Sequence, residues 1–151
     1  MIVAVLLAVL VVYLGICTVA GFGPPGPLHR FEPDAGPLVR YFAAPTEAVV
    51  SAYRTAVDAT AGMVVAEAAH HVLLIDARPT MRIIDGNFGM LLRLHFTDQG
   101  NDADVCRVTV EMMKKVPFAV ASSNASAFRQ AERALRMNAK RHGIQEMLTP
   151  A

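Results

Sequence analysis

Two adjacent histidines, His70 and His71, are the residues of this 151-residue chain whose types first suggest a metal site. Imidazole nitrogens bind Zn²⁺, and His95 or the carboxylate of Asp76 could complete a ligand set. Neighbouring residues in a strand project to opposite sides of the sheet, and His71 opens a predicted strand. Both rings could reach one ion only from a loop. The sequence therefore predicts structural or solvent-facing histidines and no metal site.

An acidic segment, residues 98–104, has some of the spacing of a calcium-binding loop. Such loops need oxygen ligands at alternate positions, a glycine at the sharp turn and a bidentate glutamate at the end. Here Gly100 takes a ligand position, Ala103 replaces the turn glycine and Thr109 stands where the glutamate belongs. The segment is therefore predicted to be a polar hairpin.

Catalytic motifs are not visible in the sequence. Residues 85–89, with the sequence DGNFG, could place a carboxylate at the tip of a turn, but no nucleophile or base accompanies it. The chain has no Walker-type phosphate loop, no Gly-x-Ser-x-Gly elbow and no Cys-x-x-Cys pair. Groups from distant segments can still assemble a site that no linear motif reveals. We expect a non-catalytic protein that uses no cofactor.

The N-terminal residues 2–20 form a run of nineteen residues without a charge. A helix rising about 1.5 Å per residue would cover about 28 Å, close to the roughly 30 Å hydrocarbon thickness of a bilayer. A secretory signal would have a basic start and a shorter apolar run. TVA at 18–20 is a poor cleavage site, and LGIC at 14–17 resembles a lipoprotein acylation box only faintly. The sequence predicts a retained transmembrane helix over residues 1–20.

Basic residues beside the span predict its orientation, because cytoplasmic flanks carry the excess of Lys and Arg. None precedes the span, whereas Arg30 and Arg40 follow it, so a cytoplasmic domain is expected. One face of the helix carries mostly small side chains that would let a partner helix approach closely. Small residues are also simply common in membrane spans. The residues of this face are Ala4, Ala8, Val11, Gly15 and Thr18.

Residues 21–37 contain four glycines and five prolines and are predicted to be a linker. Residues 38–151 are then enough for one compact domain. The net charge of +1 gives no reason to expect nucleic acid as a partner. The two cysteines, Cys17 and Cys106, fall in separate segments, so no disulfide is expected, which suits a reducing cytoplasm.

The domain is predicted to be α+β, a small antiparallel sheet with two packed helices in the order strand, helix, strands, helix. In the strand 105–115, Cys106, Val108, Val110 and Met112 alternate with polar residues and should face the core. In the last helix the apolar face holds Phe128, Ala131, Leu135 and Ala139. The predicted strands are 38–43, 63–68, 71–78, 81–84, 90–96 and 105–115, and the predicted helices run over 45–61 and from caps at 122–126 to 143.

This order of elements resembles the helix-grip architecture of START and Bet v 1-like domains. The residues that carry the resemblance are strand 38–43 leading into AAPTEAVVSAYRTAV, and the closing SAFRQAERALRMNAKRHG. It covers most of residues 38–143. The resemblance implies an apolar pocket between the sheet and the last helix, and it transfers no functional residue to this chain.

A basic face on the last helix suggests how the domain could interact. Arg129, Arg133, Arg136 and Lys140 fall within about 60° of one another around the helix, although Glu132 interrupts them. Such charges often mark only a solvated face, but beside a cytoplasmic leaflet they could bind anionic lipids or an acidic partner.

Two functions are therefore predicted. The first is a single-pass accessory or assembly subunit of a larger bacterial membrane complex, for example a respiratory or transport assembly. The alternative is a membrane-tethered domain that holds a lipid or another apolar ligand in a helix-grip pocket.

Overall fold

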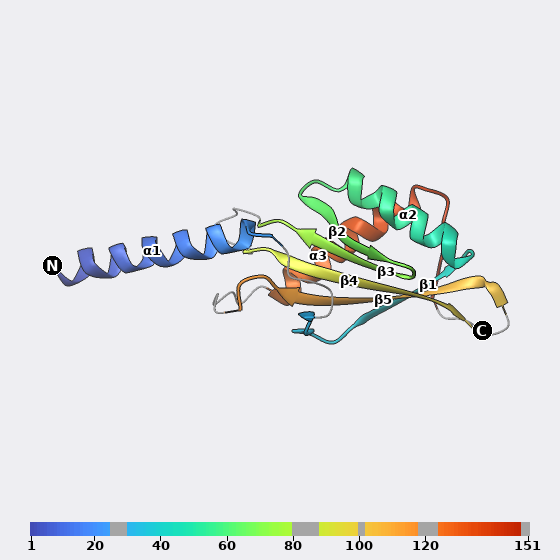
Figure 1. The fold of residues 1–151 in the computed structure, drawn as a ribbon, viewed down its shortest axis with the longest axis horizontal. Coiled ribbons are helices and arrows are strands. Elements are labelled where there is room, and N and C mark those ends of the chain that lie inside the picture. Colours follow the sequence, from blue (N-terminus) through green and yellow to red (C-terminus); the bar gives the residue numbers. More distant parts are fainter. Residues whose placement is uncertain (25–29, 80–87, 100–101, 118–123, 149–151) are drawn as a thin grey trace.

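The computed structural model describes residues 1–24, 30–79, 88–99, 102–117 and 124–148. An N-terminal helix, α1 (Ile2–Phe22), projects from one end of an α+β domain that contains the other helices and strands of the described residues (Figure 1). The predicted fold class is confirmed. Helix α1 is long and apolar enough to cross a membrane, and it continues two residues beyond the predicted span.

The domain is built on one six-stranded sheet in which every pair of neighbours is antiparallel. Its strand order is β2-β3-β4-β5-β1-β6. The first strand thus lies beside the last long one, and a short C-terminal strand extends the edge. The strands are β1 (Leu38–Ala43), β2 (Met63–Ala69), β3 (Val72–Ala77), β4 (Met90–Gln99), β5 (Asp102–Lys114) and β6 (Glu146–Met147).

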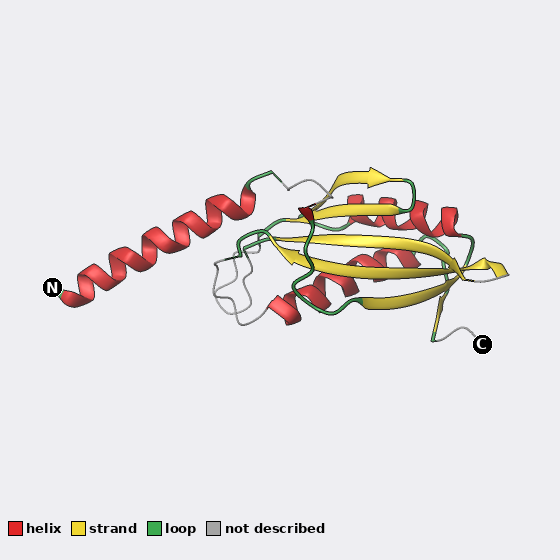
Figure 2. Cartoon of the chain, turned by 60° about the horizontal axis from the view of Figure 1, so that its bottom comes forward, coloured by secondary structure: helices red, strands yellow, loops and turns green. Residues whose placement is uncertain are grey.

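Helices α2 (Thr46–Ala59) and α3 (Asn124–Lys140) cover one face of this sheet and contact each other (Figures 1 and 2). The alternating residues of β5 that were predicted to face the core are all buried there. Tyr53 of α2 packs edge-on against the rings of Phe42 and Phe96, with ring centroids 5.8 and 5.6 Å apart. From α3, Phe128, Leu135 and Ala139 complete the core, as their helical spacing predicts.

The other face of the sheet is partly covered by the segment that precedes β1. Phe31 is buried in a cluster with Leu74 and Leu91, and the guanidinium of Arg93 lies 4.3 Å from the centre of its ring. The backbone N–H of Asp34 donates to the carbonyl of Met112 at 2.8 Å. Part of the predicted linker 21–37 is therefore packed against the sheet, because apolar residues on that face of β3 and β4 require cover.

Several boundaries differ from the predictions for local reasons. β3 begins one residue later than predicted, so His70 and His71 form the turn between β2 and β3. β4 and β5 extend into the predicted hairpin 98–104, where Gln99 pairs with Asp102. β6 was missed because two paired residues leave no periodic pattern. The predicted strand 81–84, the turn at 85–87 and the cap residues 122 and 123 lie outside the described residues.

Candidate functional site

The C-terminal turns of α1 are docked onto the domain. Cys17 is completely buried and packs with Val116, which follows β5, while Tyr13 and Phe88 pack around this pair. Residues at positions i and i+4 share one helix face, so Tyr13, Cys17 and Gly21 form the side of α1 that faces the domain. We call this contact between α1 and the domain, formed by Tyr13, Cys17, Gly21, Phe88 and Val116, the joint.

Two glycines allow the close approach of backbones in this joint. A methyl group on Gly21 would overlap the carbonyl oxygen of Phe88 and would lie 2.8 Å from the ring of Pro79. Gly89 has a φ of 89°, and a methyl group there would lie 3.1 Å from the carbonyl oxygen of Gly21. Gly15, in contrast, faces open space. The joint therefore depends on glycine at two positions that face each other.

A buried ion pair closes the joint. Lys115 has a side chain that is 4% exposed, and its Nζ donates to both carboxylate oxygens of Asp76 at 2.9 and 3.0 Å. The same Nζ donates to the carbonyl oxygen of Gly23, directly after α1, at 2.7 Å. Carbonyl groups at the C-terminal end of a helix have no intrahelical hydrogen-bond partner, so the lysine supplies a donor that this end of α1 needs. Lys115, directly after β5, thus links the end of α1 to β3.

The small-residue face predicted on α1 points away from the joint. At about 100° per residue, its centre lies about 140° around the helix from the face formed by Tyr13, Cys17 and Gly21. The residues Ala4, Ala8, Val11 and Gly15 are exposed, and Thr18 is half-buried. The hydroxyl of Thr18 donates to the carbonyl of Leu14 at 2.8 Å. Docking of the domain therefore leaves this face of α1 open, and its role in helix packing stays a prediction.

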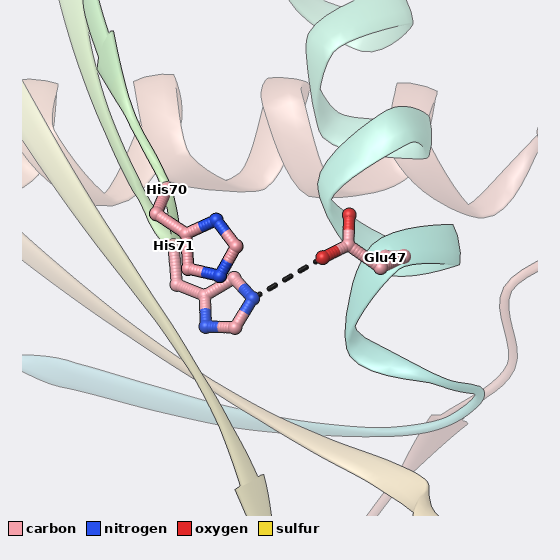
Figure 3. Close-up of side chains that lie close together, drawn as sticks. All are labelled: Glu47, His70 and His71. Carbon is pink, nitrogen blue, oxygen red and sulfur yellow. Dashed lines mark hydrogen bonds and ion pairs between the residues drawn. The ribbon is translucent and has the colours of Figure 1, made fainter.

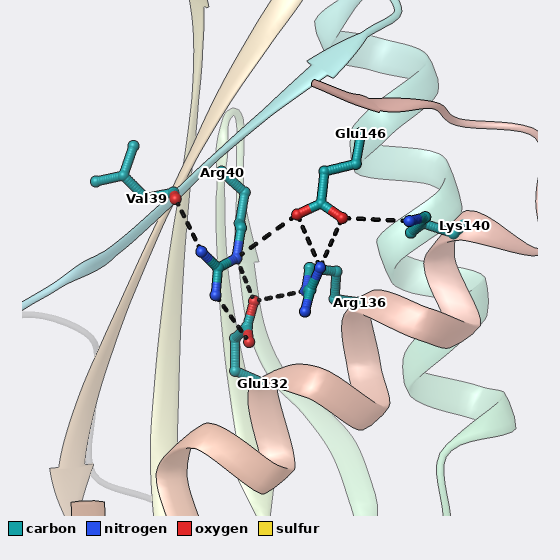
Figure 4. Close-up of polar contacts among 6 residues, drawn as sticks. All are labelled: Val39, Arg40, Glu132, Arg136, Lys140 and Glu146. Atoms are coloured by element: carbon teal, nitrogen blue, oxygen red, sulfur yellow. Dashed lines mark hydrogen bonds and ion pairs between the residues drawn. The ribbon is translucent and has the colours of Figure 1, made fainter. Parts of the chain in front are cut away.

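The predicted basic face of α3 is divided in the structure. Glu132 is only 3% exposed and accepts a hydrogen bond from Arg40 Nε at 3.0 Å, and Arg136 Nε lies 3.1 Å from the same oxygen (Figure 4). Glu146 of β6 accepts hydrogen bonds from Arg136 at 2.6 Å and from Lys140, one turn farther along α3, at 3.3 Å. Two of the four predicted basic residues are thus held in an internal ion cluster that joins α3 to β1 and β6.

Contacts within this ion cluster favour the charged forms of Arg40 and Glu146. The hydrogen bond with Glu132 raises the pKa of Arg40 against the effect of partial burial. Burial alone would raise the pKa of Glu146, but hydrogen bonds from Arg136 and Lys140, together with their charges, bring it below the ordinary value.

Arg129 and Arg133 form the outward part of the basic face. Both are exposed, and neither makes an ion pair with any residue in the described parts of the chain. They border a groove of about 380 Å³ on α3, which also contains Ser126, Gln130 and Arg40. Sequence reasoning found these arginines from their helical spacing. It missed the roles of Arg40 and Glu146, because strand pairing brings those residues to α3 from distant segments.

The two adjacent histidines lie together at the turn between β2 and β3 (Figure 3). Their rings are stacked, with centroids 4.1 Å apart and an angle of 22° between planes. Glu47, in the first turn of α2, places Oε1 3.2 Å from Nε2 of His71. Neither residue is in the strand, so the strand geometry that would separate the two rings does not apply, and His70 is exposed while His71 is half-buried.

The other two residues considered as metal ligands lie elsewhere. Asp76 is part of the joint with α1, bound to Lys115. His95 lies on the face of the sheet away from the helices, 3.5 Å from Glu111. Burial, assisted by the charge of Arg93, lowers the pKa of His95.

Side chains fill much of the space where the helix-grip resemblance implies a pocket. Tyr53 of α2 contacts Phe42 and Phe96 from the sheet, and Leu135 of α3 is completely buried in the same cluster. Such contacts are those of a packed core.

Comparison with known proteins identifies no family for this chain. No family model matches it, and no curated protein matches it. Among solved structures, the protein TTHA0849 from Thermus thermophilus aligns over 70% of this chain and 94% of its own length, with 10% sequence identity and a TM-score of 0.39.

Proposed function

We propose that this chain is a single-pass membrane-anchored, non-catalytic interaction protein, an accessory or assembly subunit of a larger bacterial membrane complex such as a respiratory or transport assembly. The observation that carries the proposal is the division of α1 into two faces. One face, with Cys17 and Gly21, is used to hold the domain. The opposite face, with Ala8 and Gly15, is left open to a second helix.

The expected orientation rests on the basic residues close to α1 in the sequence. None precedes the span and Arg30 follows it, which favours a cytoplasmic domain. Lys114 and Lys115 line the same groove as Ala20 and Arg30, but they lie far from α1 in the sequence and Lys115 is paired with Asp76, so they do not add to this rule.

The outward arginines of α3 supply a second contact surface in this proposal. Arg129 and Arg133 carry charges that no described residue neutralises, so an acidic surface of the membrane partner would bind them favourably. Anionic lipid headgroups are the other possible contact, at about 1 kcal/mol per basic residue close to a cytoplasmic leaflet. Two measurements on a variant with charge-reversed Arg129 and Arg133 distinguish the two contacts. With the chain anchored through α1 in protein-free anionic vesicles, quenching of a fluorophore on α3 by headgroup-labelled lipid reports contact of α3 with the bilayer. Unchanged quenching together with lost co-purification of the partner supports the protein contact.

Photocrosslinking in intact membranes tests the role of α1. A photoreactive residue at Ala8 lies on the open small-residue face, whereas one at Leu6 lies on the exposed opposite side and serves as the matched control. The proposal predicts an adduct between Ala8 and an integral membrane protein that is weak or missing at Leu6. It also predicts loss of that adduct when Gly15 is replaced by Leu. Equal labelling from both positions, or lipid adducts alone, would argue against a partner helix.

The alternative function, binding of a lipid or another apolar ligand, gains no support from the interior around Tyr53 and Leu135. Mass spectrometry of the purified chain under native conditions tests it. A stoichiometric apolar ligand that remains bound to the domain would favour it over the interaction function.

A further inference from the structure

We propose that Glu47, His70 and His71 form a binding site for a divalent transition-metal ion of the zinc type. The three residues offer one oxygen and two imidazole nitrogens, and the ligand atoms all lie within 4.8 Å of one another. Neutral imidazole and carboxylate are ligands that zinc prefers, and three protein ligands with an open fourth position are the usual set at reactive or exchangeable zinc sites. The proposed interaction function does not use these residues.

The distances fit a single ion. Ligand atoms about 2.0 to 2.1 Å from a tetrahedral zinc ion are about 3.3 Å from each other. Glu47 Oε1 and His71 Nε2 already lie 3.2 Å apart. His70 is exposed, so its ring can rotate to close the remaining distance without disturbing the core. The bound state therefore requires the ring of His70 to leave its stack on His71 and turn toward Glu47.

The fold holds the three ligands together. Pairing of Ala69 with Val72 fixes the two-residue turn, so both histidines project from adjacent backbone positions at the end of a hairpin. Glu47 comes from the first turn of α2, which begins after Pro45 and packs over β2. Figure 3 shows the stacked rings beside the helix turn from which Glu47 projects. The ligands therefore come from two rigid elements and not from a long loop.

The fourth coordination position would be open to solvent. A groove of about 350 Å³ adjoins the site and is lined by Glu47, His70, Ser51 and Arg54, with Val50, Ala68 and Ala69. The guanidinium of Arg54 would favour an anionic fourth ligand, such as hydroxide or a carboxylate of a partner.

The proposed metal site lies at the other end of the sheet from the joint with α1. Ala77, at the opposite end of β3, pairs with Met90, which follows Gly89 of the joint. Val72 is five residue steps along the strand from Ala77, which places the turn about 17 Å farther along the sheet. In an anchored chain the metal site would therefore face the aqueous phase.

Titration of the full chain in detergent micelles tests this proposal, with Co²⁺ as a visible probe and Zn²⁺ as competitor. Tetrahedral coordination by nitrogen and oxygen ligands gives Co²⁺ intense visible bands, which Zn²⁺ should displace at one equivalent. We expect His70→Ala and His71→Ala each to weaken binding about tenfold or more, and Glu47→Gln to weaken it by a smaller factor. His142→Ala, an exposed histidine beyond α3, is the control and should change nothing.

The proposal is overturned by any of three results. The first is absence of saturable binding up to about 1 mM metal. The second is equal metal affinity of the wild type and the His70→Ala/His71→Ala double variant. The third is a loss of metal affinity in the His142→Ala control as large as that in the His70→Ala and His71→Ala variants. Because all three ligand residues lie at the surface, unfolding curves should show that the variants remain folded, so a loss of binding can be assigned to the site.

Discussion

Lys115 and Asp76 form a buried ion pair at the point where α1 meets the sheet, with Nζ 2.9 Å from Oδ1. Lysine and aspartate are rarely buried unless they are paired. Here the same ammonium group also binds the Gly23 carbonyl, so the pair couples the end of α1 to the domain. This contact sets the orientation in which the domain would be presented beside a bilayer.

Replacing Lys115 by Met should destabilise the chain, because Asp76 would remain buried without its partner. Loss of one member of a buried pair typically costs about 3 to 5 kcal/mol. Denaturant unfolding of the full chain in micelles measures this change. The double variant Lys115→Met/Asp76→Leu should recover part of the loss, since no unpaired charge is then buried. A single variant as stable as the wild type would show that the pair does not close the joint.

Gly21→Val should open the joint, because even a methyl group at this position overlaps the backbone of Phe88. In a Cys106→Ala background, the opened joint exposes Cys17, which is buried in the native chain. Reaction with N-ethylmaleimide in micelles should therefore become much faster. Gly15→Val is the matched control, since Gly15 faces open space, and its Cys17 should react as slowly as that of the parent. Similar rates in both variants would contradict the proposed contact.

Tyr53→Phe should stabilise the domain. The Tyr53 hydroxyl is buried and has no hydrogen-bond partner among the described residues, and this burial raises the pKa of the phenol. Removal of an unsatisfied buried hydroxyl should add about 1 kcal/mol to the free energy of unfolding. Thermal unfolding of the two proteins provides the measurement. A decrease in stability would mean that the hydroxyl has a partner after all.

Glu146 should contribute to the loss of stability in acid. Its pKa in the folded chain lies below the ordinary 4.5, so the folded state releases the proton more readily than the unfolded state. The contribution is present above about pH 4.5 and disappears as the pH falls through the folded pKa. Glu146→Gln should therefore be less stable than wild type at pH 7, and the difference should shrink toward pH 3. A difference that does not depend on pH would exclude this ion cluster as its cause.

The sequence predicted those parts of the fold that repeat a simple pattern. The alternation from Cys106 to Met112 predicted a strand with its buried face, and the spacing of Phe128, Leu135 and Ala139 predicted how α3 packs. These patterns are local, and the same hydrophobic burial that produces them stabilises the structure.

Contacts between distant segments could not be predicted in this way. Phe31 lies in a Pro- and Gly-rich segment whose composition indicated only a linker, yet it covers Leu74 and Leu91. Arg40 and Glu146 reach α3 only through strand pairing. The histidine turn was misjudged because a shift of one residue in a strand boundary changes which side chains can meet. The small-residue face of α1 was found from spacing alone, but the face that binds the domain depends on Val116 and Phe88.

Membrane retention of the mature chain decides whether α1 is a permanent anchor. Cells expressing the chain with a C-terminal tag are fractionated, the membranes are washed with alkaline carbonate, and the retained protein is analysed by intact mass. We expect the protein to stay in the membrane pellet with a mass that still includes α1. Soluble protein whose N-terminus lies near Gly21 would contradict it, because the joint and the open helix face would then be absent from the mature molecule.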